Sequence, residues 1–182
     1  MRTAVLSVAA AVLLLVPGCA GGSSGPDALL QEHGLEGAST QEVVDRLDRT
    51  HEDRDAGLAG SVGYDEVVLS DGTAETSLPM PEDRFYLAVA PWTTTTHECF
   101  SHSLSGCQGE LVGEDFDVRI TDDSGAVLVD ESVTSYENGF VGFWLPKDIT
   151  GTLEIGSERG SAVEAFATSP DSPTCLTTLQ LV

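Results

Sequence analysis

The fold class is indicated most clearly by one stretch, Phe116-Asp117-Val118-Arg119-Ile120-Thr121-Asp122-Asp123-Ser124-Gly125-Ala126-Val127-Leu128-Val129-Asp130. Apolar and polar residues alternate in part on both sides of residues 122–125, as in two strands that each have one covered face. Gly125 supplies the positive φ angle that a tight hairpin turn needs. The stretch therefore predicts an antiparallel β-hairpin.

Similar short runs rich in β-forming residues, separated by turn residues, continue from residue 57 to the C-terminus. No long helical pattern lies between them, which favours an antiparallel sandwich over βαβ units. The candidate strands are residues 66–69, 85–90, 115–121, 126–130, 139–145, 152–155, 162–167 and 175–179. The predicted fold class is mainly β, an antiparallel β-sandwich-like domain preceded by two short α-helices.

The two helices are predicted in an N-terminal helical region, residues 27–56, and residues 57–182 are predicted to form the β-rich domain. The second helix has the stronger signal, because Ser39-Thr40-Gln41-Glu42 fits a capping box. Apolar side chains then share one face of this helix, and charged residues, Asp48 among them, are expected outside that face or on its flanks. The apolar face of this helix is only a few residues wide, so the helix needs a partner surface to be stable. That surface is either the protein's own sheet or another chain.

The first eighteen residues have the features of an export signal. Arg2 precedes an apolar run at residues 4–16, which is too short for a transmembrane helix of ~20 residues. Val16-Pro17-Gly18-Cys19 resembles a lipobox, so residues 1–18 are predicted to be a lipoprotein-type signal peptide with lipidation at Cys19. The alternative is an ordinary cleavage site with an incidental cysteine. Residues 19–26 are rich in Gly and Ser and predict a flexible tether.

The composition narrows the classes of partner. The chain has 8 Lys and Arg against 30 Asp and Glu, which gives a formal net charge of −22 at pH 7. Phosphate backbones repel such a surface, so nucleic acid is excluded as an expected partner. The carboxylates are spread along the chain rather than clustered, which favours a well-solvated secreted surface over a cation-binding one.

Chemically reactive side chains gather in His97-Glu98-Cys99-Phe100-Ser101-His102-Ser103-Leu104-Ser105-Gly106-Cys107, and Cys175 lies far downstream. Thiols and imidazoles in one segment indicate a soft-metal site. Exported proteins also use cysteines as disulfides. Because Cys175 is so distant in sequence, only the tertiary fold can bring it close to the other two cysteines.

Several familiar sites do not fit these spacings. The chain has no C-x2-C pair for a zinc ribbon or a thioredoxin-type thiol oxidoreductase, and no G-x-S-x-G motif of a serine hydrolase. A blue-copper site usually has a methionine ligand, and Met80 lies upstream of the cysteines. Three sulfurs with one or two imidazoles remain, the soft ligand set that selects Cu(I). One disulfide with a leftover thiol stays open as the alternative.

Several long strings occur at separations that match a known family. They are Phe85-Tyr86-Leu87-Ala88-Val89-Ala90-Pro91, Thr96-His97-Glu98-Cys99, Tyr136-Glu137-Asn138-Gly139-Phe140 and Asp171-Ser172-Pro173-Thr174-Cys175. Together with the residues around His102 and Cys107, they resemble the CueP family of periplasmic copper-binding proteins. The resemblance covers nearly all of the chain after the predicted signal peptide.

This resemblance implies a copper-tolerance protein that binds copper, preferably as Cu(I), through Cys99, Cys107 and Cys175. His97 and His102 match family positions and are secondary ligand candidates. The resemblance also implies stoichiometric, thiol-assisted reduction of Cu(II) rather than true enzymatic turnover. The implied partners are a copper-accepting enzyme such as a Cu,Zn superoxide dismutase and a second copy of the chain, joined through the N-terminal part.

The sequence thus predicts an extracytoplasmic protein that sequesters or delivers Cu(I). The lipobox and tether further predict a membrane-anchored lipoprotein on the extracytoplasmic side of the cell envelope, whereas better-known members of the family are free in the periplasm. The competing hypothesis is a surface-anchored β-sandwich that binds another molecule and uses its disulfide for stability.

Overall fold

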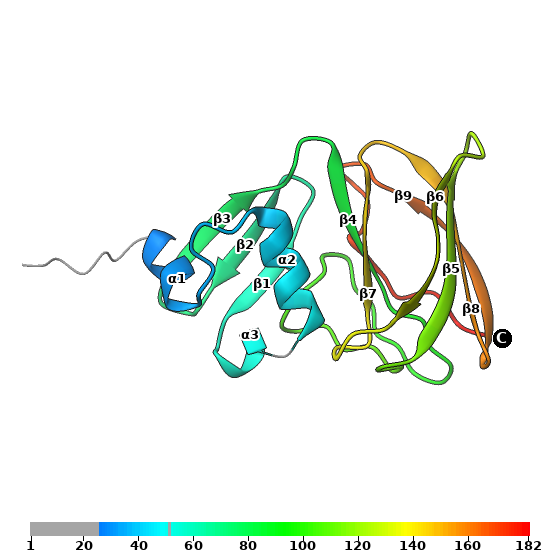
Figure 1. Ribbon diagram of the computed structural model, residues 1–182, viewed down its shortest axis with the longest axis horizontal. Coiled ribbons are helices and arrows are strands. Elements are labelled where there is room, and N and C mark those ends of the chain that lie inside the picture. The colour runs from blue at the N-terminus through cyan, green and yellow to red at the C-terminus, as the bar shows by residue number, and fades with distance from the viewer. Residues whose placement is uncertain (1–25, 51) are drawn as a thin grey trace, which may run out of the picture.

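The computed structural model describes residues 26–50 and 52–182 (Figure 1). The predicted signal peptide, the predicted lipidation site Cys19 and residues 19–25 of the predicted tether lie outside the described residues. Within the described residues, no helix has both the length and the apolar composition needed to cross a membrane.

Three helices lead into the sheets: α1 (Pro26–Glu32), α2 (Thr40–Arg49) and the single turn α3 (Glu52–Asp55). The predicted capping box at the start of α2 is confirmed, since Ser39 and Glu42 each accept a hydrogen bond from the other's backbone NH. The two short helices expected before the sheets are therefore present, and α3 adds a further turn.

One expectation about α2 is wrong. Its buried residues include Val43, Val44 and Leu47 as expected, but Asp48 is buried as well, with 0% of its surface exposed. Asp48 follows Val44 by four positions, and residues at this spacing lie on the same helical face. The apolar face therefore carries a carboxylate into the interior.

The first sheet is antiparallel and contains β1 (Ala59–Val62), β2 (Glu66–Ser70) and β3 (Glu75–Pro79), in that order. The sequence predicts β2 but misses β1 and β3. These two strands contain Ala, Gly, Glu and Pro, which strands ordinarily disfavour. They form because each pairs with β2 along its whole length.

The second sheet has the order β10-β4-β7 and consists of β10 (Cys175–Leu176), β4 (Arg84–Val89) and β7 (Val141–Pro146). β4 and β7 are antiparallel, whereas β10 runs parallel to β4. The last predicted strand, residues 175–179, is thus shorter than expected and departs from antiparallel pairing. The chain continues beside the extension of β4, where Leu181 N donates to Trp92 O at 2.8 Å.

The third sheet is antiparallel, with β6 (Val127–Thr134) at one edge, β5 (Asp115–Asp122) and β8 (Thr150–Ser157) in the middle and β9 (Gly160–Ala167) at the other edge. The β5–β6 hairpin confirms the prediction from the sequence. Gly125 has a φ angle of 85°, and its NH donates to the carbonyl of Asp122 at 2.9 Å.

The second and third sheets face one another in Figure 1. The side chains between them form an apolar core. The core includes Phe85, Leu87, Val89, Phe116, Val118, Ile120, Val141, Phe143, Leu145, Leu153 and Ile155. The predicted sandwich is therefore confirmed. We call the space between these two sheets the sandwich core.

Strand β4 separates the sandwich core from a second one. Successive side chains of a strand point to opposite faces. Phe85 and Leu87 enter the sandwich core, whereas Tyr86 and Ala88 face the helices and the first sheet. The second cluster, which also contains Cys107 and Cys175, is called the helix-side core.

Candidate metal centre

Three cysteines from two distant segments meet in the helix-side core. Cys99 and Cys107 lie on the long connection between β4 and β5, and Cys175 begins β10. Cys99 and Cys175 form a disulfide with their Cα atoms 5.6 Å apart. Cys107 is a free, buried thiol, and its Sγ lies 3.4 Å from Sγ of Cys99. All three predicted sulfurs are thus brought together, with a pairing that the spacing left open.

A tight turn places Cys107. The carbonyl of Ser103 accepts hydrogen bonds from the NH of Cys107 at 3.0 Å and from that of Gly106 at 3.3 Å. A Cβ atom at position 106 would lie 2.6 Å from Oγ of Ser103, so any larger residue there would displace that hydroxyl. The NH of Ser103 also points at Sγ of Cys107, 3.3 Å away. Backbone geometry therefore fixes the thiol.

Thr174 connects the two cysteine-bearing segments. Its hydroxyl donates to the carbonyl of Val62 at 2.9 Å and accepts from the NH of His102 at 2.9 Å. Its own NH donates to the carbonyl of Phe100 at 2.8 Å. Because Thr174 directly precedes Cys175, these bonds fix that cysteine relative to the loop that carries the other two.

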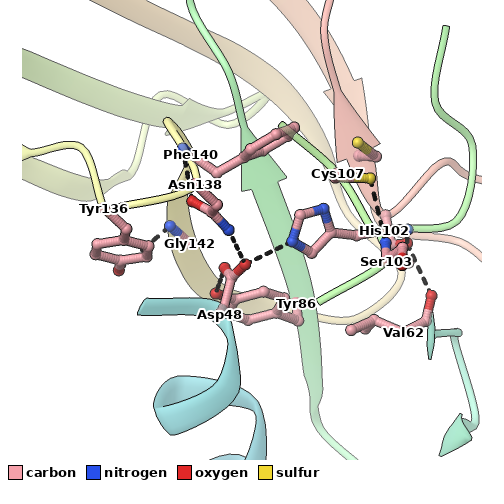
Figure 2. A network of polar contacts seen from close by, with 12 residues as sticks. Asp48, Val62, Tyr86, His102, Ser103, Cys107, Tyr136, Asn138, Phe140 and Gly142 are labelled. Atoms are coloured by element: carbon pink, nitrogen blue, oxygen red, sulfur yellow. Dashed lines mark hydrogen bonds and ion pairs between the residues drawn. The ribbon is translucent and has the colours of Figure 1, made fainter. Parts of the chain in front are cut away.

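His102 is the fourth member of the cluster. Ligand atoms of Cys99, His102, Cys107 and Cys175 all lie within 4.8 Å of one another. The imidazole is fully buried, and its Nε2 lies 2.6 Å from Oδ1 of Asp48. Among the described residues its buried Nδ1 has no hydrogen-bond partner, and it lies on the side of the ring that faces Cys107 in Figure 2. One ring nitrogen is therefore anchored and the other is left for a ligand.

Asp48 is held by two further donors besides His102. Asn138 Nδ2 donates to Oδ1 at 2.8 Å, and the hydroxyl of Tyr86 donates to Oδ2 at 2.5 Å (Figure 2). Sequence reasoning missed this carboxylate because it treated Asp48 as a flanking residue. The signal that could have found it is the four-residue spacing from Val44, which places Asp48 on the buried face.

The buried groups shift one another's proton affinities. Burial disfavours the charged imidazole, but the hydrogen bond with Asp48 and the nearby Cys107 sulfur outweigh it and raise the pKa of His102 to about 9. Burial likewise disfavours a thiolate, but His102 and His97 outweigh it and lower the pKa of Cys107 to about 7. An anionic sulfur beside a cationic ring is therefore favoured near neutral pH.

His97 lies at the rim of the site. It is exposed, it is not one of the four clustered groups, and its ring centroid is 6.2 Å from that of Phe140. It lines an open groove of about 440 Å³ together with Trp92, Thr96, Glu98, Cys99, Thr177 and Thr178. The other three clustered groups are buried, whereas Cys99 is half-buried. Solvent therefore reaches the site through this groove.

The donor set determines which metal chemistry is available. Three sulfurs and one imidazole nitrogen are soft and intermediate ligands, which suit Cu(I) better than hard cations such as Mg²⁺ or Ca²⁺. The cluster offers all three sulfurs to a metal only after the Cys99–Cys175 disulfide is reduced, because the thiolate is the ligand form.

Comparisons with known proteins agree with this site. The profile of the family described as "CueP: Periplasmic copper-binding protein CueP" matches residues 42–180. A solved structure described as "Crystal Structure of S.CueP" is similar, with 46% sequence identity and a TM-score of 0.83 over 88% of this chain and 99% of that one. No curated protein matches the chain. With the family profile spanning most of its length, the chain belongs to the CueP family of periplasmic copper-binding proteins.

Proposed function

We propose that this protein binds Cu(I) through the thiolates of Cys99, Cys107 and Cys175, with Nδ1 of His102 as a nitrogen ligand. The observation that carries the proposal is the convergence of these four ligand atoms within 4.8 Å of one another. The free thiol of Cys107 already lies beside the disulfide, 3.4 Å from Sγ of Cys99. When the disulfide is reduced, the three thiol sulfurs surround one position that a Cu(I) ion can occupy.

The same sulfurs supply electrons for the reduction of Cu(II). Two Cu(II) ions each take one electron from the thiols of Cys99 and Cys175, which lose two protons and form the disulfide, and two Cu(I) ions result. The observed disulfide joins that pair. An external dithiol returns the protein to its copper-binding form by thiol–disulfide exchange. The reduction is stoichiometric in protein unless such a dithiol is supplied.

Copper reaches the site along the groove that contains His97. Cys99 is the clustered residue with the greatest exposure, and His97 stands beside it as an exposed imidazole. His97 acts as a transient ligand there, and the ion then moves inward to the buried sulfurs.

Anaerobic titration with Cu(I) against a competing chelator tests the proposal. Cys99→Ser, Cys107→Ser and Cys175→Ser should each lower the Cu(I) affinity sharply, because each removes one sulfur ligand. Ser105→Ala, a change in the same loop that removes no ligand, is the matched control. X-ray absorption then counts sulfur and nitrogen ligands. Unchanged affinity in all three cysteine variants would refute the proposal.

The protein works in the cell envelope as a lipoprotein anchored through Cys19. The support is the apolar run followed by Val16-Pro17-Gly18-Cys19. Fractionation of cells tests it: the wild-type protein should remain with membranes, and Cys19→Ser should move to the soluble fraction. Mass spectrometry of the mature N-terminal peptide should detect the lipid.

The protein buffers the bound Cu(I) or passes it to a copper-accepting enzyme, such as a Cu,Zn superoxide dismutase. The chain also pairs with a second copy through its N-terminal part. The support is the family to which the chain belongs. Transfer to the copper-free enzyme is measured by the activity it gains. Light scattering measures the mass of the full chain in solution, and a mass twice that of one chain supports the pair.

A second candidate function is a binding module in which the disulfide serves stability. The Cys99–Cys175 bond is the observation that favours it. Mass spectrometry of the native protein separates the two functions. A disulfide that remains intact when copper and a dithiol are added favours the binding module, and one that opens with the dithiol and closes with Cu(II) favours copper handling.

A further inference from the structure

The contacts of Asp48 are not explained by copper binding through sulfur. A carboxylate buried away from water is costly unless charges or hydrogen bonds compensate it. Asp48 is fully buried, and it is compensated by His102, Asn138 and Tyr86 within 2.5 to 2.8 Å. The carboxylate comes from α2, far from the cysteines in sequence, and it contacts the one imidazole of the cluster.

The hydrogen bond to Asp48 fixes which nitrogen of His102 can bind a metal. A carboxylate accepts hydrogen bonds, so Nε2 carries its proton toward Oδ1, 2.6 Å away. A metal can then bind only at Nδ1, and it displaces the Nδ1 proton of the cationic ring as it binds, because a ligating nitrogen must be free of a proton. Nδ1 is the atom left without a partner, and Figure 2 shows it on the side of Cys107.

Packing prevents the ring from adopting another orientation. The ring of Phe140 lies 4.7 Å from that of His102 and the ring of Tyr86 lies 6.5 Å away, measured between centroids. Asn138 in turn ties Asp48 to the β6–β7 connection, because its Oδ1 accepts from the NH of Phe140 at 2.9 Å. The carboxylate and the imidazole are therefore held from three sides.

We propose that Asp48 is a positioning residue of the copper site, which holds the Nε2 proton of His102 and so directs Nδ1 to the metal. This inference rests on the proposed function. It makes α2 a part of the site, although the four clustered ligand groups all come from other segments. Metal-binding histidines in proteins are commonly oriented by carboxylates in this way.

The chain offers a matched control on the same helix. Asp45 lies three residues before Asp48 and accepts a hydrogen bond from Nε1 of Trp144 at 2.7 Å. This bond also joins α2 to the β10-β4-β7 sheet, but Asp45 is not among the hydrogen-bond partners of His102. Asp45→Ala removes this acceptor and therefore perturbs helix docking without changing the orientation of the imidazole.

The first experiment needs no copper. In the reduced, metal-free protein labelled with ¹⁵N, we expect an imidazole Nε2–H signal of His102 that exchanges slowly with water. Asp48→Ala should abolish the signal or make exchange much faster, and Asp45→Ala should leave it unchanged. Asp48→Leu fills a similar space without any acceptor atom, and it provides the test if Asp48→Ala does not fold. Equal protection in the wild type and in the folded Asp48 variant overturns the proposal.

The second experiment measures Cu(I) affinity with a competing chelator. Asp48→Leu should weaken binding roughly 10- to 100-fold, the usual effect of removing a residue that orients a metal ligand. In a His102→Gln background the same change should have less than about a two-fold further effect, because Asp48 acts through the imidazole. If the Asp48 substitution lowers the Cu(I) affinity by the same factor with and without His102, Asp48 does not act through the imidazole. That result indicates a structural role only and overturns the proposal.

X-ray absorption separates this inference from the proposed function. A nitrogen ligand in the wild-type protein that is lost in Asp48→Leu supports it. A wild-type protein that binds Cu(I) through sulfur alone keeps the proposed function and overturns the positioning role. A wild-type protein that fails to bind Cu(I) overturns the proposed function, and the proton-exchange measurement does not depend on that result.

Discussion

The two cores of this protein lie back to back on β4 and differ in what they enclose. The sandwich core is built from large apolar side chains such as Phe116, Ile120 and Leu153. The helix-side core contains two of the cysteines and surrounds Asp48 and His102, a fully buried carboxylate and a fully buried imidazole.

The difference shows how one strand can serve stability and chemistry at once. Burial of apolar surface stabilises the sandwich core without directional contacts. In the helix-side core each buried polar group must find a partner, so its geometry is restricted. We therefore expect stability and copper binding to respond separately to changes on the two sides of β4.

The largest expected effect comes from Phe116→Ala in the sandwich core. Phe116 is 1% exposed, and its truncation should lower the free energy of unfolding by about 3–5 kcal/mol, because it removes apolar burial and leaves a cavity. Urea unfolding measures this loss. The folded variant should keep the Cu(I) affinity of the wild type, and a parallel loss of affinity would contradict the separation of the cores.

A smaller effect is expected from Tyr86→Phe on the opposite face of β4. The change removes the hydroxyl that donates to Oδ2 of Asp48 at 2.5 Å. We expect the free energy of unfolding to fall by about 1.5–3 kcal/mol, the usual worth of a hydrogen bond to a charged group.

Tyr64→Phe is the matched control for this change. The hydroxyl of Tyr64 donates to Oδ1 of Asp148 at 3.0 Å near the surface, so its loss should cost much less in the same urea experiment. Equal losses in the two variants would show that the polar network around Asp48 has no special role in stability.

The reactivity of Cys107 tests the electrostatics of the helix-side core. Only the thiolate is alkylated, so the rate rises with pH through the thiol pKa. Because the pKa of Cys107 is lowered from 9.0 to about 7, the rate in the disulfide-bonded protein should reach half its maximum near pH 7. Mass spectrometry of the Cys107 peptide after iodoacetamide treatment gives the rate. His102→Gln should move the midpoint toward 9, and a midpoint unaffected by this change would exclude His102 as the cause.

The smallest effect is expected on the exposed face of the third sheet. Arg119 and Asp130 form an ion pair at 2.6 Å, with about half of each side chain or more exposed (47% and 62%). Arg119→Ala should change the free energy of unfolding by about 1 kcal/mol or less, since solvent screens the pair. The loss should shrink further in high salt. A loss as large as that of Tyr86→Phe would contradict the contrast between surface and buried charges.

Strands with strong local patterns were predictable, and those with weak patterns were not. The eight predicted strands all have counterparts, because alternation and turn residues lie within each segment. β1 and β3 escaped prediction because their residues have low strand preference, and they form by pairing with β2.

The candidate site divides in the same way. Cys99, Cys107 and Cys175 could be singled out by residue type, and His102 by its place in the cysteine segment. Asp48 could not be singled out, since an acidic residue on a short helix is ordinarily solvated. Its partners Tyr86 and Asn138 come from two other segments.

The sequence by itself determined the mainly β class, the hairpin at Gly125, the capped helix and the candidate sulfur ligands, because these depend on residue types and patterns within short segments. Only the tertiary structure decided the Cys99–Cys175 pairing, the parallel seating of β10 on β4 and the contact of Asp48 with His102. Each of these joins residues far apart in the chain. Their meeting depends on how two sheets and a helix pack, and no local periodicity encodes that packing.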